Sequence, residues 1–197
     1  AHDVLADWAW ALLSLGHRTL GEERLEEMQR VTLHRCLAHR YRLLAQMSAA
    51  EMAQLTVEGM RGHFSAPGRQ GDVEVVEEED RWVLSFDPCG SGGRMRRGDA
   101  LNGTPSRYDP PFAFTSVEGA YPWTWGEKGV CLYCSHCSFV NEILPIEHLG
   151  YPMRVTENPR DPGDKCRWMV YKRPDLVPEE AYRRVGKEKP ARFRSGG

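Results

Sequence analysis

Three cysteines and a histidine stand close together in the segment Cys131-Leu-Tyr-Cys134-Ser-His136-Cys137. One cysteine at every third residue cannot place all three thiols in a single apolar core. Thiolates at this spacing can, however, converge on one metal ion from a tight turn. Cys166 is the natural candidate for the fourth position. We therefore predict a zinc centre held by Cys131, Cys134, Cys137 and Cys166.

Other occupants of this cluster stay open. Structural zinc sites usually have two CxxC pairs far apart, whereas this chain has one overlapping CxxCxxC run. In one alternative, only two of these three thiols bind the metal, and Glu147 and His148 serve as substitute ligands. An iron–sulfur cluster also fits three cysteines and a distant fourth, although the Cys-Pro continuation of ferredoxins is missing. Free or redox-active thiols are the remaining alternative.

A second group of reactive residues follows a predicted strand, in Asp87-Pro-Cys89-Gly-Ser91-Gly-Gly-Arg94-Met-Arg96-Arg97. Glycines expose backbone N–H groups, and nearby arginines would lower the pKa of Cys89 and bind a carboxylate through paired hydrogen bonds. We predict that Ser91, Arg94 and Arg96 bind substrate. The alternative is a glycine-rich turn with a buried cysteine and solvated arginines.

Further candidates come from the histidines and from an aromatic loop. Residues 95–127 have little periodicity but many aromatic side chains, which favours an ordered loop that covers a pocket. Trp123 and Trp125 are predicted to wall this pocket, and core packing is the alternative reading for both. The predicted catalytic residues are Cys89, His136 and His148.

The elements that position these residues begin with helices. Apolar residues recur every third or fourth position from about 22 to 46, after an apolar stretch that Gly16 closes. Cys36 falls on this stripe and is expected to be a small core residue. A capping box, Ser48-Ala-Ala-Glu51, predicts the start of the next helix.

Strands and turns fill the rest of the chain. We predict a loop over 65–71 and a hairpin of strands at 73–76 and 81–86, then a short helix through Ile143. Strands are also predicted at 153–156 and 166–172, with a surface arm after Pro174. The fold class is α+β, an N-terminal helical layer on a small, mostly antiparallel sheet. The predicted regions are a helical part (1–64), a cysteine-rich α+β part (65–174) and a basic C-terminal arm (175–197), within one compact domain.

Two closing segments resemble known families. Glu147-His-Leu-Gly-Tyr-Pro, followed by Gly163-Asp-Lys-Cys166-Arg-Trp168, resembles the end of 4-vinyl-reductase-type domains. It is also similar to the end of proteins like L-2-amino-thiazoline-4-carboxylate hydrolase. The resemblance implies an α+β domain whose cysteines gather around a small-molecule pocket, in some members with zinc.

Composition narrows the functional classes. A net charge of −2 over 197 residues argues against nucleic-acid binding, and no apolar run is long enough for a membrane span. No signal peptide is visible, and clustered cysteines favour a reducing cytoplasm over a disulfide framework. We expect a cytoplasmic zinc enzyme, a hydrolase or lyase acting on a small carboxylate-bearing substrate, and we leave a homo-oligomer open. The alternatives are a non-catalytic zinc-stabilised binding or sensing module, and a thiol-redox or iron–sulfur protein.

Overall fold

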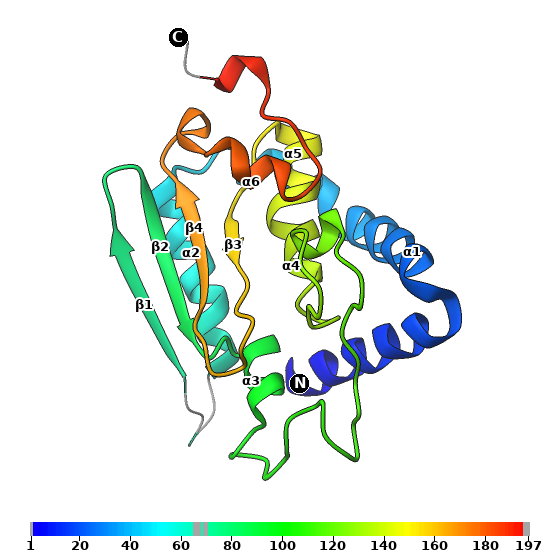
Figure 1. The fold of residues 1–197 in the computed structure, drawn as a ribbon. Coiled ribbons are helices and arrows are strands. Elements are labelled where there is room, and N and C mark those ends of the chain that lie inside the picture. Colours follow the sequence, from blue (N-terminus) through cyan, green and yellow to red (C-terminus); the bar gives the residue numbers. More distant parts are fainter. Residues whose placement is uncertain (1, 65–67, 69–70, 195–197) are drawn as a thin grey trace.

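The computed structural model describes residues 2–64, 68 and 71–194, and its fold is α+β, as predicted (Figure 1). Four antiparallel strands form one sheet in the order β1-β2-β4-β3. The strands are β1 (Asp72–Glu77), β2 (Arg81–Asp87), β3 (Val155–Glu157) and β4 (Cys166–Tyr171). The α-helices are α1 (His2–Leu44), α2 (Ala49–Arg61), α3 (Gly92–Arg97), α4 (His136–Ser138), α5 (Leu144–Leu149) and α6 (Glu179–Arg183). Helix α2 packs against β2 and β4.

The sheet brings two of the cysteine segments together. In the central pair of strands, Phe86 near the end of β2 faces Cys166, the first residue of β4. The chain leaves β2 through Asp87 and reaches Cys89 two residues later. Cys89 and Cys166 therefore emerge at the same end of the sheet. The predicted hairpin is confirmed, and β3 begins two residues later than expected.

Helix α1 does not end at Gly16, as the sequence predicted, but continues to a sharp bend at Gly21. Gly21 has φ 77°, a left-handed conformation that glycine adopts without a Cβ penalty. The two halves of α1 approach each other beside Gly16, where an added Cβ would lie 3.1 Å from Leu25 Cδ1. Gly16 thus permits a close contact, while Gly21 supplies the bend seen in Figure 1.

The expectation that Cys36 is a core residue is wrong, because its side chain is exposed. The inward side of α1 carries Leu25, Gln29 and Tyr41, which are buried, and partly buried Leu33 and Leu37. These positions follow one another in steps of four. Cys36 is one residue before Leu37 and so points about 100° away from that stripe.

The capping box at the start of α2 is confirmed. The Ser48 hydroxyl accepts the backbone N–H of Glu51, and the Glu51 carboxylate accepts the backbone N–H of Ser48. Two backbone donors that the first helical turn leaves without partners are satisfied in this way. The predicted loop before β1 lies mostly outside the described residues.

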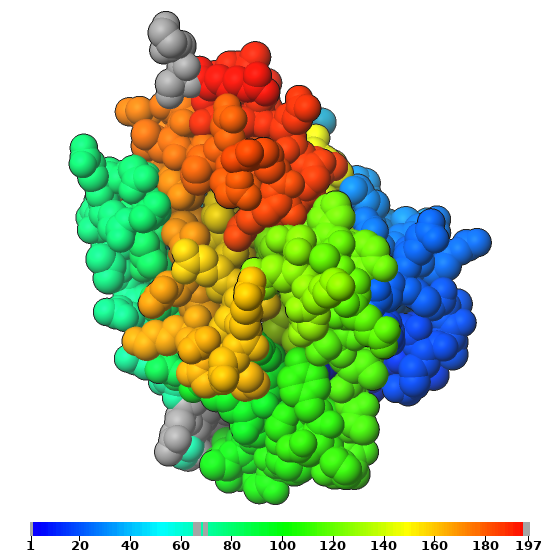
Figure 2. All heavy atoms as spheres, in the orientation of Figure 1, coloured from blue at the N-terminus to red at the C-terminus, as the bar shows by residue number. Residues whose placement is uncertain are grey.

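The C-terminal segment differs from the surface arm that we expected. Val177, Ala181, Tyr182 and Val185 are all at most 3% exposed, and they include three apolar residues at a spacing of four. Figure 2 shows this segment, in orange and red, seated directly on the yellow and green parts of the chain. In this segment, basic residues alternate along the sequence with apolar residues, and the apolar residues form a face that completes the core.

The long segment between α3 and α4 has little regular structure but packs against α1. The Trp10 indole N–H donates to the Thr115 carbonyl at 2.9 Å, and its ring contacts Tyr108 edge-on. Glu22, near the bend of α1, accepts the backbone N–H groups of Glu118 and Gly119. Along the described part of the chain, no helix has the length and apolar character that crossing a membrane requires.

Candidate metal–thiolate site

Four cysteines line a single cavity of about 270 Å³. They come from three separate parts of the chain: Cys89 follows β2, Cys134 and Cys137 bracket the start of α4, and Cys166 begins β4. Their thiols lie near enough to influence one another. Burial is the largest cause of the raised pKa of Cys166. The next causes are the neighbouring thiols of Cys89, Cys137 and Cys134. The structure thus brings together three of the four predicted metal ligands, and it adds Cys89.

The four cysteines share the lining of this cavity with other residues. Within the described ranges, no group of three or more His, Cys, Asp or Glu side chains has a geometry that could hold a metal ion. The cavity is several times the volume of a water molecule, which is about 30 Å³. The predicted zinc site therefore stays a prediction.

Cys131, the remaining predicted ligand, does not line this cavity. It borders a different cavity together with Arg96 and Arg160. Its backbone pairs with Ser116 in an extended bridge, before the turn that carries Cys134. The Cys131 thiol nevertheless lies within hydrogen-bonding reach of the Cys134 thiol. Cys131 therefore touches one of the cavity cysteines from outside the cavity.

Glycines let the backbone approach the thiols closely. A Cβ added to Gly92 would lie 2.5 Å from Cys134 Sγ, and one added to Gly93 would lie 3.4 Å from Cys89 Sγ. The backbone N–H of Gly93 donates to Cys89 Sγ at 3.0 Å. The glycine-rich loop is therefore fitted around two of the sulfur atoms, and no side chain larger than glycine fits at Gly92 without displacing Cys134.

The environment keeps most of these thiols protonated in the absence of metal. Burial raises the pKa of Cys89, and the neighbouring Cys134 raises it further, although the N–H groups of Gly93 and Ser91 lower it. Burial is also the largest cause of the raised pKa of Cys137. Metal binding at this site would have to displace these protons.

Two cations, one buried and one half-buried, adjoin the thiols without a carboxylate partner among the described residues. Arg96 is 5% exposed and donates to the carbonyls of Pro159 and Arg160, at 2.8 and 2.6 Å. Burial opposes the charge and lowers the pKa of Arg96. Neighbouring groups outweigh burial and raise this pKa, and Cys134 is the first among them.

Arg154 is the second cation. Its guanidinium donates to the neutral oxygens of Thr56 and Asn141, at 2.8 and 3.2 Å. Burial lowers its pKa to about 10, and Cys137 is the first of the groups that oppose this shift. A buried charge is costly unless it is paired, so thiolates at Cys134 and Cys137 would compensate both arginines.

His136 lies against the thiols. Its Nδ1 interacts with the Tyr133 carbonyl, and its Nε2 lies 3.7 Å from Cys137 Sγ. Burial lowers the pKa of His136, so the neutral ring is favoured, with the Tyr133 carbonyl acting in the opposite direction. A carbonyl can only accept, which places the proton on Nδ1 and leaves Nε2 as a base facing Cys137.

The other residues predicted for the site divide into two groups. Ser91 and Arg96 line the cavity with the cysteines, whereas Arg94 does not. Arg94 forms an ion pair with Asp99 at 2.7 Å, and both side chains are 5% exposed. Carboxylate binding by Arg94 and Arg96 stays a prediction, and it requires them to exchange their present protein partners.

His148, Trp123 and Trp125 also lie away from the cavity. His148 is exposed on α5 and stacks between the rings of His34 and Tyr41. Trp123 and Trp125 are core residues, and the Trp125 indole donates to Glu142 at 2.7 Å. The core-packing reading of the two tryptophans fits their positions.

Sequence reasoning gave too little weight to several residues that line the cavity. His63, at the end of α2, and His2, in the first turn of α1, stack with ring centroids 3.8 Å apart. The spacing of His2 and His63 in the sequence does not predict this contact, because the packing of α1 and α2 brings them together. Tyr133 and Trp168, by contrast, neighbour cysteines in the sequence, and that proximity was the available signal.

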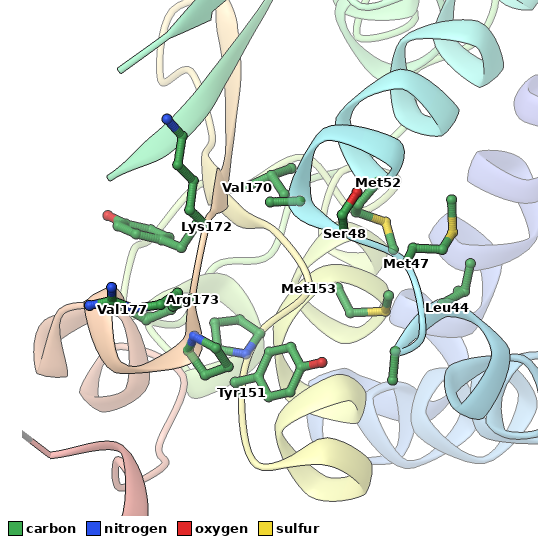
Figure 3. Close-up of a pocket in the computed structure, with 15 residues that line it drawn as sticks. Leu44, Met47, Ser48, Met52, Tyr151, Met153, Val170, Lys172, Arg173 and Val177 are labelled. Carbon is green, nitrogen blue, oxygen red and sulfur yellow. The ribbon is translucent and has the colours of Figure 1, made fainter. Parts of the chain in front are cut away.

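A second cavity of about 240 Å³ lies between the end of α1, the start of α2 and β4 (Figure 3). Methionine side chains (Met47, Met52 and Met153) and Tyr151 contribute much of its lining, and Lys172 lies on the strand side. Thiols and histidines do not line it. The cysteine-lined cavity therefore carries the stronger case for chemistry.

Comparison with known proteins adds no further constraint. No family model matches the chain, and neither a curated protein nor a solved structure was found to match it. The resemblance to 4-vinyl-reductase-type and L-2-amino-thiazoline-4-carboxylate hydrolase-like domains accordingly stays a prediction.

Proposed function

We propose that this protein is a metal–thiolate protein whose centre forms the inner wall of a pocket for a small polar ligand. The observation that carries the proposal is the meeting of Cys89, Cys134, Cys137 and Cys166 around one cavity. Packing alone does not explain four buried or half-buried cysteines from three segments at one place, beside a glycine-rich loop fitted to two of their sulfurs.

Charge balance supports the proposal. Four thiolates bound to a divalent ion or to a cluster core give a dianion. Arg96 and Arg154 supply two positive charges beside Cys134 and Cys137. In the metal-bound form these two arginines would gain the partners that neutral thiols do not offer.

The pocket suits a small ligand. Its volume of about 270 Å³ is just below the range of about 300–1,000 Å³ that is usual for drug-sized molecules. Histidines and polar groups line it together with the thiols: His2, His63, Ser91, His136, Asn158 and Asp164. We propose hydrolase or lyase chemistry on a small polar compound, with His136 Nε2 as the base.

A four-thiolate zinc would take a structural role here. Zinc bound by four cysteines has a complete tetrahedral shell, and catalytic zinc keeps one position for water or substrate. Any proton transfer would then depend on side chains next to the centre, such as His136 and His63. A non-catalytic binding module is the second candidate, and the closed set of four thiols favours it.

Metal analysis of protein purified without chelators tests the proposal. Wild-type protein should contain stoichiometric iron or zinc, and Cys137→Ser should lose most of it. Cys36→Ser is the matched control, because Cys36 is an exposed thiol on α1 away from the cavity. Wild-type protein without stoichiometric metal would overturn the proposal. If His136→Gln keeps its metal and lacks the turnover that wild type shows on small amides and thioethers, the enzyme assignment is supported.

A further inference from the structure

The first half of α1 is apolar on two opposite faces. One face enters the core through Ala6 and Trp10, which are at most 3% exposed. On the other side, the exposed residues between positions 4 and 15 are all large and apolar, and each is between 46% and 71% exposed. They are Val4, Leu5, Trp8, Leu12 and Leu15, and we call them the outer stripe of α1. A helix that is apolar all round is normally buried, so the composition of this face calls for a partner.

The spacing of the outer stripe fits a second helix. At about 100° per residue, its five side chains lie within an arc of about 100°, on the side of the helix opposite Trp10. From Leu5 to Leu15 its members follow one another in steps of three, four and three residues, which is the a/d spacing of a coiled-coil seam. A second copy of the stripe that runs antiparallel places Leu5 opposite Leu15, and Trp8 opposite Leu12. The stripe is therefore complementary to itself about a two-fold axis.

Area and charge favour a second copy of this chain as the partner. Side chains of this size at these exposures offer roughly 100 Å² each, so two copies would bury about 1,000 Å² between them, the area at which specific interfaces begin. An antiparallel pair brings the end that carries Asp3 and Asp7 against the end that carries exposed Arg18, so that opposite charges meet. The sequence has no Lys or Arg before Arg18, which disfavours an anionic membrane as the partner of the stripe.

We propose that this protein forms a symmetric dimer through the outer stripe of α1, with the two helices antiparallel. In Figure 1 the bent α1 forms one edge of the molecule, where a second copy can approach. None of the five residues of the stripe lines the cysteine-lined cavity. The dimer thus goes beyond the metal–thiolate function and forms with or without metal.

Sedimentation of the purified chain over a range of concentrations tests the dimer. Wild type should sediment as a dimer at micromolar concentration. Leu12→Glu should raise the dissociation constant of the dimer at least about 100-fold, because it would bury a charge in the seam. Leu55→Glu is the matched control and should leave the dimer intact, since Leu55 on α2 and Leu12 are both 46% exposed. Far-ultraviolet circular dichroism checks that both variants fold.

A second pair of variants tests the orientation of the two helices. Leu5→Lys and Leu15→Glu should each weaken the dimer, because each places a charge against a leucine in two layers of the seam. Mixed in equal amounts, the two variants should form a tighter dimer than either forms alone. The mixture pairs one lysine with one glutamate and keeps one layer of two leucines, whereas a parallel pair would show no such gain.

Four results would overturn the proposal. The first is a wild-type chain that stays monomeric at every concentration. The second is a Leu55→Glu variant that loses the dimer as completely as Leu12→Glu does, and the third is a mixture of Leu5→Lys and Leu15→Glu without any gain. The fourth is binding of monomeric wild type to vesicles of phosphatidylcholine and phosphatidylserine, which would assign the stripe to a lipid surface instead.

Discussion

Gly92→Ala is a small change that acts directly on the proposed site. The added Cβ would lie 2.5 Å from Cys134 Sγ, whereas ordinary contacts begin at 3.4 Å. The sulfur or the loop must therefore move by about 1 Å, and metal sites tolerate ligand displacements of only about 0.2 Å. We expect the affinity for metal to fall by at least about tenfold. This is comparable to the effect of removing a side chain that hydrogen-bonds to a metal ligand.

The same substitution also perturbs the metal-free protein. Overpacking of a buried site costs about 1–3 kcal/mol, and each kcal/mol lowers the Tm of a domain of this size by roughly 2–4 °C. Gly59→Ala is the matched control. Gly59 lies in α2, and an added Cβ there meets no atom within 4 Å. This control should leave metal content unchanged and raise stability by about 1 kcal/mol, because alanine is the better helix former.

The assays are metal analysis of both variants and thermal unfolding of their metal-free forms. If Gly92→Ala keeps full metal content and the wild-type Tm, then Cys134 Sγ does not lie against Gly92. The geometry on which the site rests would then be refuted. A variant that unfolds but binds metal when refolded with it would refute the predicted loss of affinity alone.

Three further predictions concern the scaffold. Glu142→Ala should destabilise the protein by about 3–5 kcal/mol in urea unfolding, because it leaves Arg184, 2.7 Å away in the wild type, without its fully buried partner. Ser48→Ala should cost about 1 kcal/mol by removing the cap of α2, and wild-type stability would contradict this. Burial raises the pKa of Glu147, but its ion pairs with Lys187 and Arg30 outweigh this and hold the pKa below the usual range of a glutamate. The folded-state pKa is thus depressed, so Glu147 contributes stability that is present above the unfolded-state pKa and is lost as pH falls through the folded-state pKa. Glu147→Gln should therefore flatten the acid side of the stability–pH curve, and an unchanged slope would refute this.

Local signals in the sequence predicted local structure well. The capping box at Ser48 and the β1–β2 hairpin depend on neighbouring residues, and both are confirmed. The end of the first helical stretch was placed at Gly16, whereas α1 bends at Gly21, since a glycine in a helical pattern can mark either an end or a close contact. Which of the two applies is decided by packing, here by Leu25.

Which residues form the candidate site depends on contacts between segments that are distant in the sequence. Cys134, Cys137 and Cys166 were grouped correctly because spacing and residue type suggest shared ligation. Cys89 was assigned to a separate chemistry, because its proximity to Cys166 depends on the register that pairs Phe86 with Cys166. Cys131 was included because it continues the CxxC spacing; its thiol contacts that of Cys134, but its side chain does not line the cavity.

Metal content of Cys89→Ser and Cys131→Ser tests the central claim most directly. Both remove one buried thiol of the same size, but only Cys89 lines the cavity. The account predicts that Cys89→Ser loses metal, as Cys137→Ser does, while Cys131→Ser keeps close to the wild-type amount. Loss of metal in Cys131→Ser together with retention in Cys89→Ser would contradict the account.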